Sequence, residues 1–392
     1  MRFTVIGLTD GREPWFPPEV QAAIASGHVF SGGRRHHEIV ADMLPEGAQW
    51  IDITVPLEAV FEQYRAYEEI VVFASGDPLF FGFANTIRRE LPDAEVTVYP
   101  AFNSLQMLAH RMLLPYADMR TVSLTGRSWD AFDAALIQGE KLIGVLTDRQ
   151  KTPAAIASRM LEYGYGNYRM TVGENLGNSA AERVRTLPLA EAAVGEYSSP
   201  NCLILEQIAA RPHPFGIPES QFELLDGRVN MITKMPVRLL TLSQMDLPRR
   251  TSFWDVGFCT GSVSIEAKLQ FPHLKVTSFE VREQGRSLME SNARKFGVPG
   301  ITAIIGDFLE ADLSAYPVPD AVFIGGHGGK LVEMLHRIDE VLLPGGVIVF
   351  NAVSEESQAL FREGVAAVGR KVTGQMRAAI DGFNPITILK AE

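Results

Sequence analysis

The first half of the chain alternates short apolar runs, rich in β-branched residues, with longer amphipathic stretches. Runs of the first kind predict strands, and apolar residues at a helical spacing predict helices. The predicted strands are Phe3–Gly7, Ile70–Ala74, Glu95–Tyr99, Thr121–Leu124, Leu142–Leu146 and Asn201–Glu206. The predicted helices are Pro18–Ser26, Phe81–Leu91, Ser104–Leu113 and Pro153–Tyr163. This alternation indicates an α/β fold.

The second half shows the same alternation with its own set of elements. The predicted strands are Ser252–Val256, Lys275–Glu280, Ile301–Ile305, Asp320–Ile324 and Val347–Asn351. The predicted helices are Pro236–Met245, Ser262–Leu269, Gln284–Phe296 and Lys330–Leu342. Strand and helix in strict succession predict a doubly wound, mostly parallel sheet.

A proline-rich segment separates the two halves. The run AARPHPFGIP, residues 209–218, holds three prolines and one glycine. Proline biases the residue before it away from the helical conformation, so neither pattern continues through this run. We therefore predict a linker at residues 209–215, with one domain over residues 1–208 and a second over residues 216–392.

The length, net charge and number of cysteines of the chain narrow the class of protein. A chain of 392 residues suits two domains of about 100–200 residues each. The net charge of −11 argues against nucleic acid and anionic membrane as partners. We expect no membrane span and no signal peptide, and we expect a cytoplasmic protein. The two cysteines, Cys202 and Cys259, are too few for a disulfide framework or a four-ligand zinc site, so no metal site is predicted.

The segment FWDVGFCTGS, residues 253–262, carries the strongest chemical signal. It is an apolar strand, a glycine-bearing turn and a helix start, where free N–H groups and bare backbone can meet a ligand. Two acids follow at the ends of the next two strands, suited to the ribose and the adenine of a nucleoside. The predicted cofactor-binding residues of this half are Asp255, Gly257, Thr260, Gly261, Glu280, Asp307 and Gly325.

This arrangement predicts a class I (Rossmann-like) methyltransferase fold. The turn D-x-G-x-x-T-G differs from the G-x-G-x-x-G of dinucleotide sites, which must also cradle a pyrophosphate. Cys259 stands where a second glycine is expected, and we interpret it as a packed small hydrophobe. The loop IGGHGGK, residues 324–330, has four glycines and no proline, which leaves room for a large flat substrate. His327 is its candidate substrate contact or proton shuttle.

Two ordered sets of motifs resemble the family of precorrin-6Y C5,15-methyltransferases (decarboxylating). The N-terminal motifs are SGGRR (Ser31–Arg35), ASGDPLFFG (Ala74–Gly82), SLTGR (Ser123–Arg127) and ENLG (Glu174–Gly177). The C-terminal motifs are GIPESQF (Gly216–Phe222), MITK (Met231–Lys234), DVGFCTGSVSIEA (Asp255–Ala267), SNARKFG (Ser291–Gly297) and FIGGHGGKL (Phe323–Leu331). The resemblance implies a tetrapyrrole methylase fold for the N-terminal half.

The resemblance also implies the chemistry. The N-terminal half would methylate carbon 5 of a corrin-precursor tetrapyrrole, and the C-terminal half would methylate carbon 15 and decarboxylate the ring C acetate. S-Adenosylmethionine would be the cofactor in both. The N-terminal residues implied for cofactor binding are Gly7, Gly76, Asp77, Pro78 and Ser104.

The substrate that the resemblance implies would carry many carboxylates, so cations should surround it. The candidate substrate-binding residues are Arg34, Arg35, Arg127, Lys234, Arg282 and Lys330. A proton must be moved at decarboxylation, and His327 and Glu266 are the candidates, although Glu266 could instead face solvent or pair with a neighbour. Two cofactor loops depart from the family pattern, as GLTDG at residues 7–11 and PAFNS at residues 100–104.

Two alternatives stay open at this point. One is an RNA or protein methyltransferase, against which the acidic charge and the loop at residues 324–330 count. The other is a fusion in which one half only binds substrate. Related domains suggest a homo-oligomer.

Overall fold

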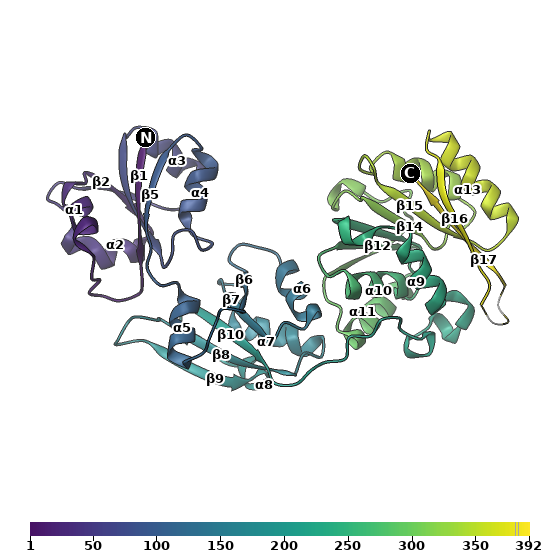
Figure 1. Cartoon of the computed structure of the whole chain (residues 1–392), viewed down its shortest axis with the longest axis horizontal. Helices are drawn as coiled ribbons and strands as arrows, with labels where there is room; N and C mark the ends of the chain where they lie inside the picture. Colours follow the sequence, from purple (N-terminus) through teal and green to yellow (C-terminus); the bar gives the residue numbers. More distant parts are fainter. Residues whose placement is uncertain (381, 383) are drawn as a thin grey trace. The chain divides into compact units, whose positions relative to one another are not determined.

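The computed structural model describes residues 1–380, 382 and 384–392, and these form two compact units. The first unit comprises residues 1–127, 141–158 and 168–208, and the second comprises residues 128–140, 159–167 and 209–392. Figure 1 shows the elements along the chain. The domain limits inferred from the sequence remain a prediction. No helix in the described part of the chain is long and apolar enough to cross a membrane.

The first unit contains a five-stranded parallel sheet in the order β3-β2-β4-β1-β5. Its strands are β1 Arg2–Leu8, β2 Val29–Gly32, β3 Gln49–Asp52, β4 Glu69–Ser75 and β5 Glu95–Tyr99. Its helices are α1 Pro18–Ser26, α2 Arg34–Val40, α3 Glu58–Tyr64 and α4 Phe83–Glu90. Apolar side chains of α1 and α2 pack on one face and those of α3 and α4 on the other, because both faces of a parallel sheet must be covered.

The second sheet of this unit is mixed, with the order β6-β7-β10-β8-β9. Its strands are β6 Arg120–Ser123, β7 Leu142–Leu146, β8 Tyr168–Glu174, β9 Arg183–Pro188 and β10 Asn201–Gln207. The helices near it in sequence are α5 Ser104–Met112, α6 Asp130–Gln138, α7 Pro153–Glu162 and α8 Leu189–Ala192. β10 runs antiparallel to both β7 and β8, whereas β6 and β7 are parallel. Helix α5 buries Leu105 and Leu108 against Ile204 of β10.

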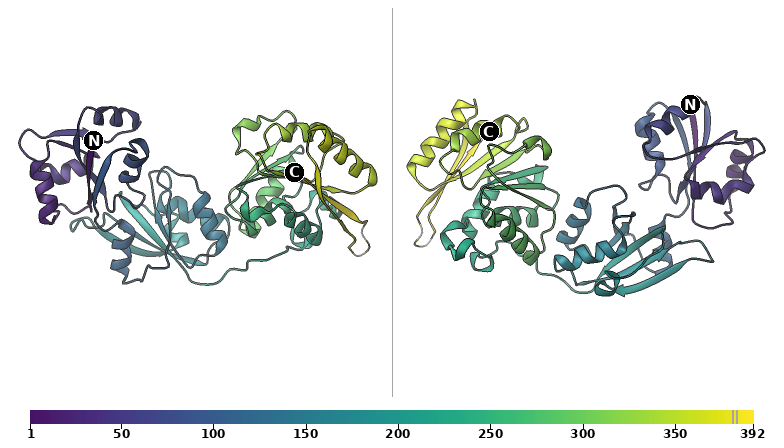
Figure 2. Two further views of the ribbon diagram at one scale, coloured as in Figure 1. Left: turned by 45° about the horizontal axis from the view of Figure 1, so that its top comes forward. Right: turned by 180° about the vertical axis from the view of Figure 1, so that it is seen from behind.

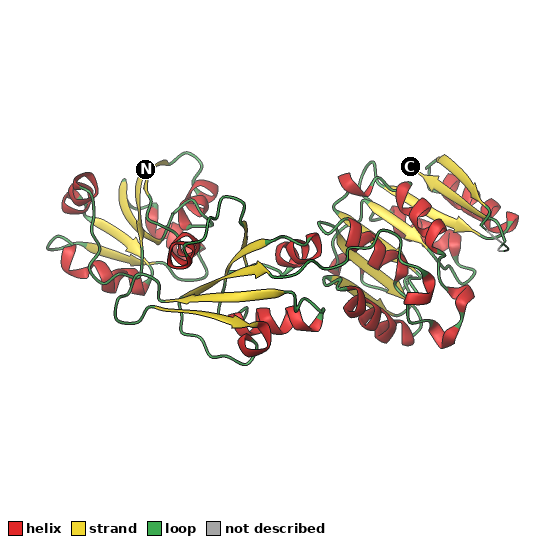
Figure 3. Cartoon of the chain, turned by 60° about the horizontal axis from the view of Figure 1, so that its bottom comes forward, coloured by secondary structure: helices red, strands yellow, loops and turns green. Residues whose placement is uncertain are grey.

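The second unit is built on a seven-stranded sheet in the order β13-β12-β11-β14-β15-β17-β16. Its strands are β11 Ser252–Val256, β12 Lys275–Glu280, β13 Ile301–Ile305, β14 Ala321–Ile324, β15 Val347–Ala352, β16 Val372–Ala378 and β17 Ile386–Ala391. Its α-helices are α9 Met235–Ser243, α10 Ser262–Gln270, α11 Gln284–Phe296, α12 Leu331–Asp339 and α13 Glu355–Ala367. Figures 2 and 3 show the strands of this unit with helices on both sides.

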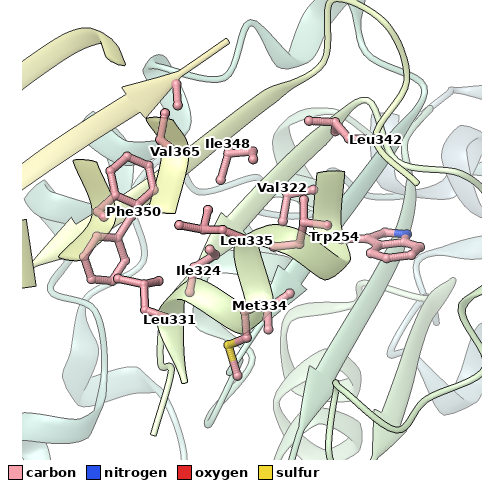
Figure 4. Packing of buried hydrophobic residues seen from close by; sticks show 14 of the residues in the cluster. Trp254, Val322, Ile324, Leu331, Met334, Leu335, Leu342, Ile348, Phe350 and Val365 are labelled. Atoms are coloured by element: carbon pink, nitrogen blue, oxygen red, sulfur yellow. The ribbon is translucent and has the colours of Figure 1, made fainter. Parts of the chain in front are cut away.

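The packing of this sheet explains its apolar strands. Trp254, Val322 and Ile348 come from neighbouring strands and belong to one buried cluster with Leu335 of α12 and Val365 of α13 (Figure 4). Side chains of α9 and α10 cover the opposite face. All four residues of β14 are buried, as expected of a central strand with both faces covered. The class I fold predicted from the sequence is confirmed.

Some elements differ from the sequence predictions. Helix α4 begins two residues later than expected, because Phe81 has a φ of 55° and Gly82 is the N-cap. Helix α12 ends at Asp339 instead of Leu342. β17 inserts between β15 and β16 and is antiparallel to both, so the sheet is parallel only over β11–β15. The predictions did not include the strands β2, β3, β8, β9, β16 and β17 or the helix α13.

Candidate functional sites

The second unit has a cavity of about 680 Å³ at the carboxyl ends of β11, β14 and β15. Strand order reverses between β11 and β14, and ligands of doubly wound sheets bind at such a switch point. The turn after β11, the loop after β14 and the segment before α9 line this cavity. Predicted site residues that line it are Asp255, Gly257, Thr260, Gly325, Lys234 and Arg282.

The turn after β11 is tightly packed. Gly257 has a φ of 80°, and a Cβ there would lie 2.6 Å from the backbone nitrogen of Gly326. Only glycine fits this position without displacing the loop after β14. Gly261, with a φ of 76°, is the N-cap of α10. Cys259 adopts a φ of 51° although it carries a side chain, so a non-glycine residue occupies the left-handed region here.

Two buried polar atoms at this turn lack partners. Asp255 is fully buried, and its Oδ2 atom accepts hydrogen bonds from the backbone and hydroxyl of Ser264. Its Oδ1 atom and the Oγ1 atom of Thr260 have no hydrogen-bond partner among the described residues. Burial raises the pKa of Asp255 to about 7. Buried polar groups are normally paired, so these atoms are suited to a polar ligand in the cavity.

Glu280, the last residue of β12, holds the same turn from the side. Its Oε2 atom accepts from the backbone N–H of Cys259 at 2.9 Å. Its Oε1 atom accepts from the backbone N–H of Arg282 at 3.0 Å and from the Arg282 guanidinium at 3.2 Å. The side chain is 2% exposed. This acid therefore fixes the turn, and it is not itself among the residues that line the cavity.

Asp307 and Lys330 form an ion pair. The Lys330 ammonium lies 2.8 Å from the Asp307 carboxylate, which also accepts from the backbone N–H of Leu309. The hydrogen bond with Lys330 is the main cause that lowers the pKa of Asp307. A predicted cofactor residue and a predicted substrate residue thus meet each other. His327, half-buried in the same loop, accepts from the backbone N–H of Gly329 at 3.2 Å.

Glu266 has a structural position. It is fully buried on α10, and its carboxylate accepts from the backbone N–H groups of Gly216 and Ile217. The guanidinium of Arg238, also fully buried, lies 3.2 Å from its Oε2 atom. Glu266 is not among the residues that line the cavity. The structure therefore places it in an ion pair with a neighbour and away from the candidate site.

The first unit has its candidate site at the carboxyl ends of β1 and β4, where Leu8 and Ser75 are in register. One cavity here, of about 400 Å³, is lined by Gly76, Ser104 and Arg35. A second, of about 640 Å³, is lined by Gly7 and Asp77. The loops that meet at this edge come from segments far apart in the sequence.

Close backbone contacts explain the predicted glycine at position 7. A Cβ on Gly7 would lie 2.0 Å from the carbonyl oxygen of Gly76 and 2.6 Å from the nitrogen of Ala101. Asp77 accepts from the backbone N–H of Leu79 at 2.8 Å, an Asx turn, and Pro78 is buried beside it. The shortened GLTDG loop therefore still brings bare backbone against the SGDP loop.

The predicted cations of this unit differ in their surroundings. Arg35 pairs with Asp10 at 3.1 Å and donates to the hydroxyl of Ser75 at 2.9 Å. Arg34 has a side chain 92% exposed, and Arg127 lies over the ring of Phe81 at 5.1 Å.

Sequence reasoning did not select Asp10, Ser75 or His36, which line the same cavity as Arg35. The first two lie in runs already singled out, GLTDG and SGDP, so a closer reading of those runs could have found them. His36 directly follows the SGGRR run.

Comparison with known proteins covers both units. Residues 2–193 match the family model of tetrapyrrole (corrin/porphyrin) methylases, and residues 225–388 match that of the precorrin methyltransferase domain. The precorrin-6Y C(5,15)-methyltransferase [decarboxylating] of Sinorhizobium sp. is 34% identical over 374 residues, covering 93% of this chain and 88% of that protein.

Two shorter proteins of Salmonella typhimurium match parts of the chain. The cobalt-precorrin-6B C(15)-methyltransferase (decarboxylating) is 40% identical and covers 34% of this chain and 68% of its own length. The cobalt-precorrin-7 C(5)-methyltransferase is 26% identical and covers 52% of this chain and 98% of its own length.

Proposed function

The chain belongs to the family of precorrin-6Y C5,15-methyltransferases (decarboxylating), and on that premise we propose that it methylates carbons 5 and 15 of precorrin-6B or its cobalt form. The methyl donor in both reactions is S-adenosylmethionine. Residues 1–208 serve carbon 5. Residues 216–392 serve carbon 15 and remove carbon dioxide from the ring C acetate.

The observation that carries this proposal is the pair of unpartnered buried atoms at the turn after β11. The Oδ1 atom of Asp255 is an acceptor and the Oγ1 atom of Thr260 can donate or accept, and both residues line the cavity. The methionine end of the cofactor carries ammonium donors and carboxylate acceptors, which suit these two atoms. Gly257 leaves the backbone bare where the ligand must approach. These residues fit S-adenosylmethionine.

The chain itself has to orient the cofactor and the substrate and to enclose them. When bound, the cofactor supplies a methyl group already activated on a sulfonium, so few catalytic side chains are needed. The cavities of each unit are proposed to hold the reactants in line and to exclude water. Arg35 and Lys234 line these cavities, and we assign them to the carboxylates of the substrate. His327, in the loop after β14, is the candidate group for proton transfer at decarboxylation.

The test is incubation of the full chain with precorrin-6B or its cobalt form and S-adenosylmethionine. Mass spectrometry should show a gain of two methyl groups and the loss of one carbon dioxide. A matched variant is Gly257→Val, whose side chain collides with Gly326 and should abolish carbon 15 methylation and decarboxylation while carbon 5 is still methylated. Gain of one methyl group by the unaltered chain would mean that one half only binds substrate. No gain at all would overturn the proposal.

A further inference from the structure

Ser75 ends β4 at the N-terminal cavity, and its hydroxyl oxygen meets two neighbours from α2. The Nη2 atom of Arg35 lies 2.9 Å away, and the Nε2 atom of His36 also lies 2.9 Å away. All three residues line the cavity of about 400 Å³. Ser75 is exposed. Where the Ser75 hydroxyl points its proton therefore depends on whether either neighbour can accept a hydrogen bond from it.

Neither neighbour can accept that proton. Arginine carries only donors. The Nδ1 atom of His36 accepts the backbone N–H of Gly33 at 3.2 Å, so this nitrogen carries a lone pair. A neutral imidazole then has its proton on Nε2, which makes that nitrogen a donor toward Ser75.

The histidine stays neutral in this position. Burial, assisted by the adjacent positive charge of Arg35, lowers the pKa of His36 to about 4, and a hydrogen bond to the backbone of Phe73 opposes this shift only in part. Near neutral pH its tautomer is therefore set by the bond from Gly33. The hydroxyl of Ser75 makes no other hydrogen bond to the part of the chain that the structure describes.

The Ser75 oxygen thus receives two hydrogen bonds and keeps its own proton for a group in the cavity. We infer that the hydroxyl of Ser75 donates a hydrogen bond to a carboxylate of the tetrapyrrole and positions it for methylation at carbon 5. This inference rests on the proposed function and adds Ser75 to the substrate-binding residues. Two donors to one hydroxyl polarise it, which strengthens the bond it donates.

Charge favours the substrate over the cofactor as the acceptor. The Arg35 guanidinium stands beside the hydroxyl and is held there by Asp10, which is 6% exposed. S-Adenosylmethionine has a net positive charge near neutral pH, since its sulfonium and ammonium outweigh one carboxylate. The tetrapyrrole carries several carboxylates and no such cation. A carboxylate that accepts from Ser75 also gains the attraction of Arg35.

The test compares Ser75→Ala with the isosteric pair Ser75→Thr and Ser75→Val in the full chain. Loss of a charge-assisted hydrogen bond predicts a KM for the tetrapyrrole about tenfold or more higher for carbon 5 methylation in Ser75→Ala and Ser75→Val. Ser75→Thr, which retains the hydroxyl, should recover most of the loss. The KM for S-adenosylmethionine and the methylation of carbon 15, followed with an isotope-labelled methyl group, should be unaffected in all three.

Two results would overturn the inference. One is a tetrapyrrole KM that is equal in Ser75→Thr and Ser75→Val. The other is a rise in the KM for S-adenosylmethionine instead, which would assign the hydroxyl to the cofactor. Equilibrium binding of the tetrapyrrole to Ser75→Thr and Ser75→Val is a separate readout. If the unaltered chain binds the tetrapyrrole but adds no methyl at carbon 5, the proposed function fails, while the Thr–Val difference in affinity still decides the role of Ser75.

Discussion

The backbone N–H of Cys259 donates to the Oε2 atom of Glu280 at 2.9 Å, so the acid at the end of β12 holds the turn that follows β11. The other carboxylate oxygen of Glu280 accepts from Arg282. One side chain therefore links two neighbouring strand ends at the place where the cofactor is proposed to bind.

Replacing Glu280 with Ala should weaken the binding of S-adenosylmethionine at least tenfold at one of the two sites of the chain. The variant loses a carboxylate whose hydrogen bonds each contribute about 1.5–3 kcal/mol. The turn after β11 also loses the acceptor that holds it. Calorimetric titration of the full chain measures both binding events. Glu280→Gln, which keeps one acceptor oxygen, is the matched control. Its affinity for S-adenosylmethionine should lie between those of the unaltered chain and Glu280→Ala. Unchanged affinity in Glu280→Ala would remove this residue from the site.

Cys259→Gly should stabilise the chain relative to Cys259→Ala by about 1 kcal/mol. The φ of 51° costs any residue with a Cβ about 1–2 kcal/mol, and glycine adopts it freely at a smaller cost in unfolded-state entropy. Urea unfolding of the two variants gives this difference directly. A variant with Ala as stable as the one with Gly would show that the turn is not strained at this residue.

Asp255→Asn should change how stability depends on pH. Burial raises the pKa of Asp255 to about 7 from the ordinary 3.8, so the folded chain holds the proton more tightly than the unfolded chain. The resulting stabilisation is complete below about pH 4 and is lost as pH rises to 7.

Between pH 6 and pH 8 the unaltered chain, free of cofactor, should therefore lose about 1 kcal/mol relative to Asp255→Asn. Thermal unfolding of both chains at the two pH values measures this. If the stability of the two chains depended on pH in the same way, the assignment of a raised pKa to Asp255 would be wrong.

Glu266→Ala should lower the free energy of unfolding by about 3–5 kcal/mol, because it leaves the buried guanidinium of Arg238 without its partner. Glu290→Ala, at an acid 51% exposed on α11, should cost less than about 0.5 kcal/mol. Urea unfolding followed by circular dichroism compares the two. If Glu266→Ala unfolds like the control yet loses decarboxylation, the residue has a chemical role after all.

Asp77→Ala should impair methylation of carbon 5 and leave carbon 15 unaffected. Asp77 forms the Asx turn that fixes the SGDP loop against Gly7, and it lines the cavity of about 640 Å³. Mass spectrometry of the product should then show one methyl group gained and carbon dioxide lost. Two methyl groups added at the normal rate would make Asp77 purely structural. Loss of both would show that the two active sites are coupled.

The sequence by itself determined the order of the main strands and helices and the position of the chemistry along them. Apolar periodicity is a local property, so it predicted β11, β12, β13 and the turn between β11 and α10. It also placed Asp255 and Glu280 on strand ends, where the structure has them. It did not predict β16 and β17 as a strand pair, although partly buried and exposed residues alternate along most of β16.

Only the tertiary structure decided which side chains meet. Lys330 and Asp307 are 23 residues apart and form an ion pair, and Glu266 meets Arg238 across 28 residues. The hydroxyl of Ser75 reaches Arg35 across 40 residues. Such contacts depend on how strands are ordered in a sheet and how helices lie against it. Local propensity carries no information on that order, because it is set by the burial of surfaces that come together only in the folded chain.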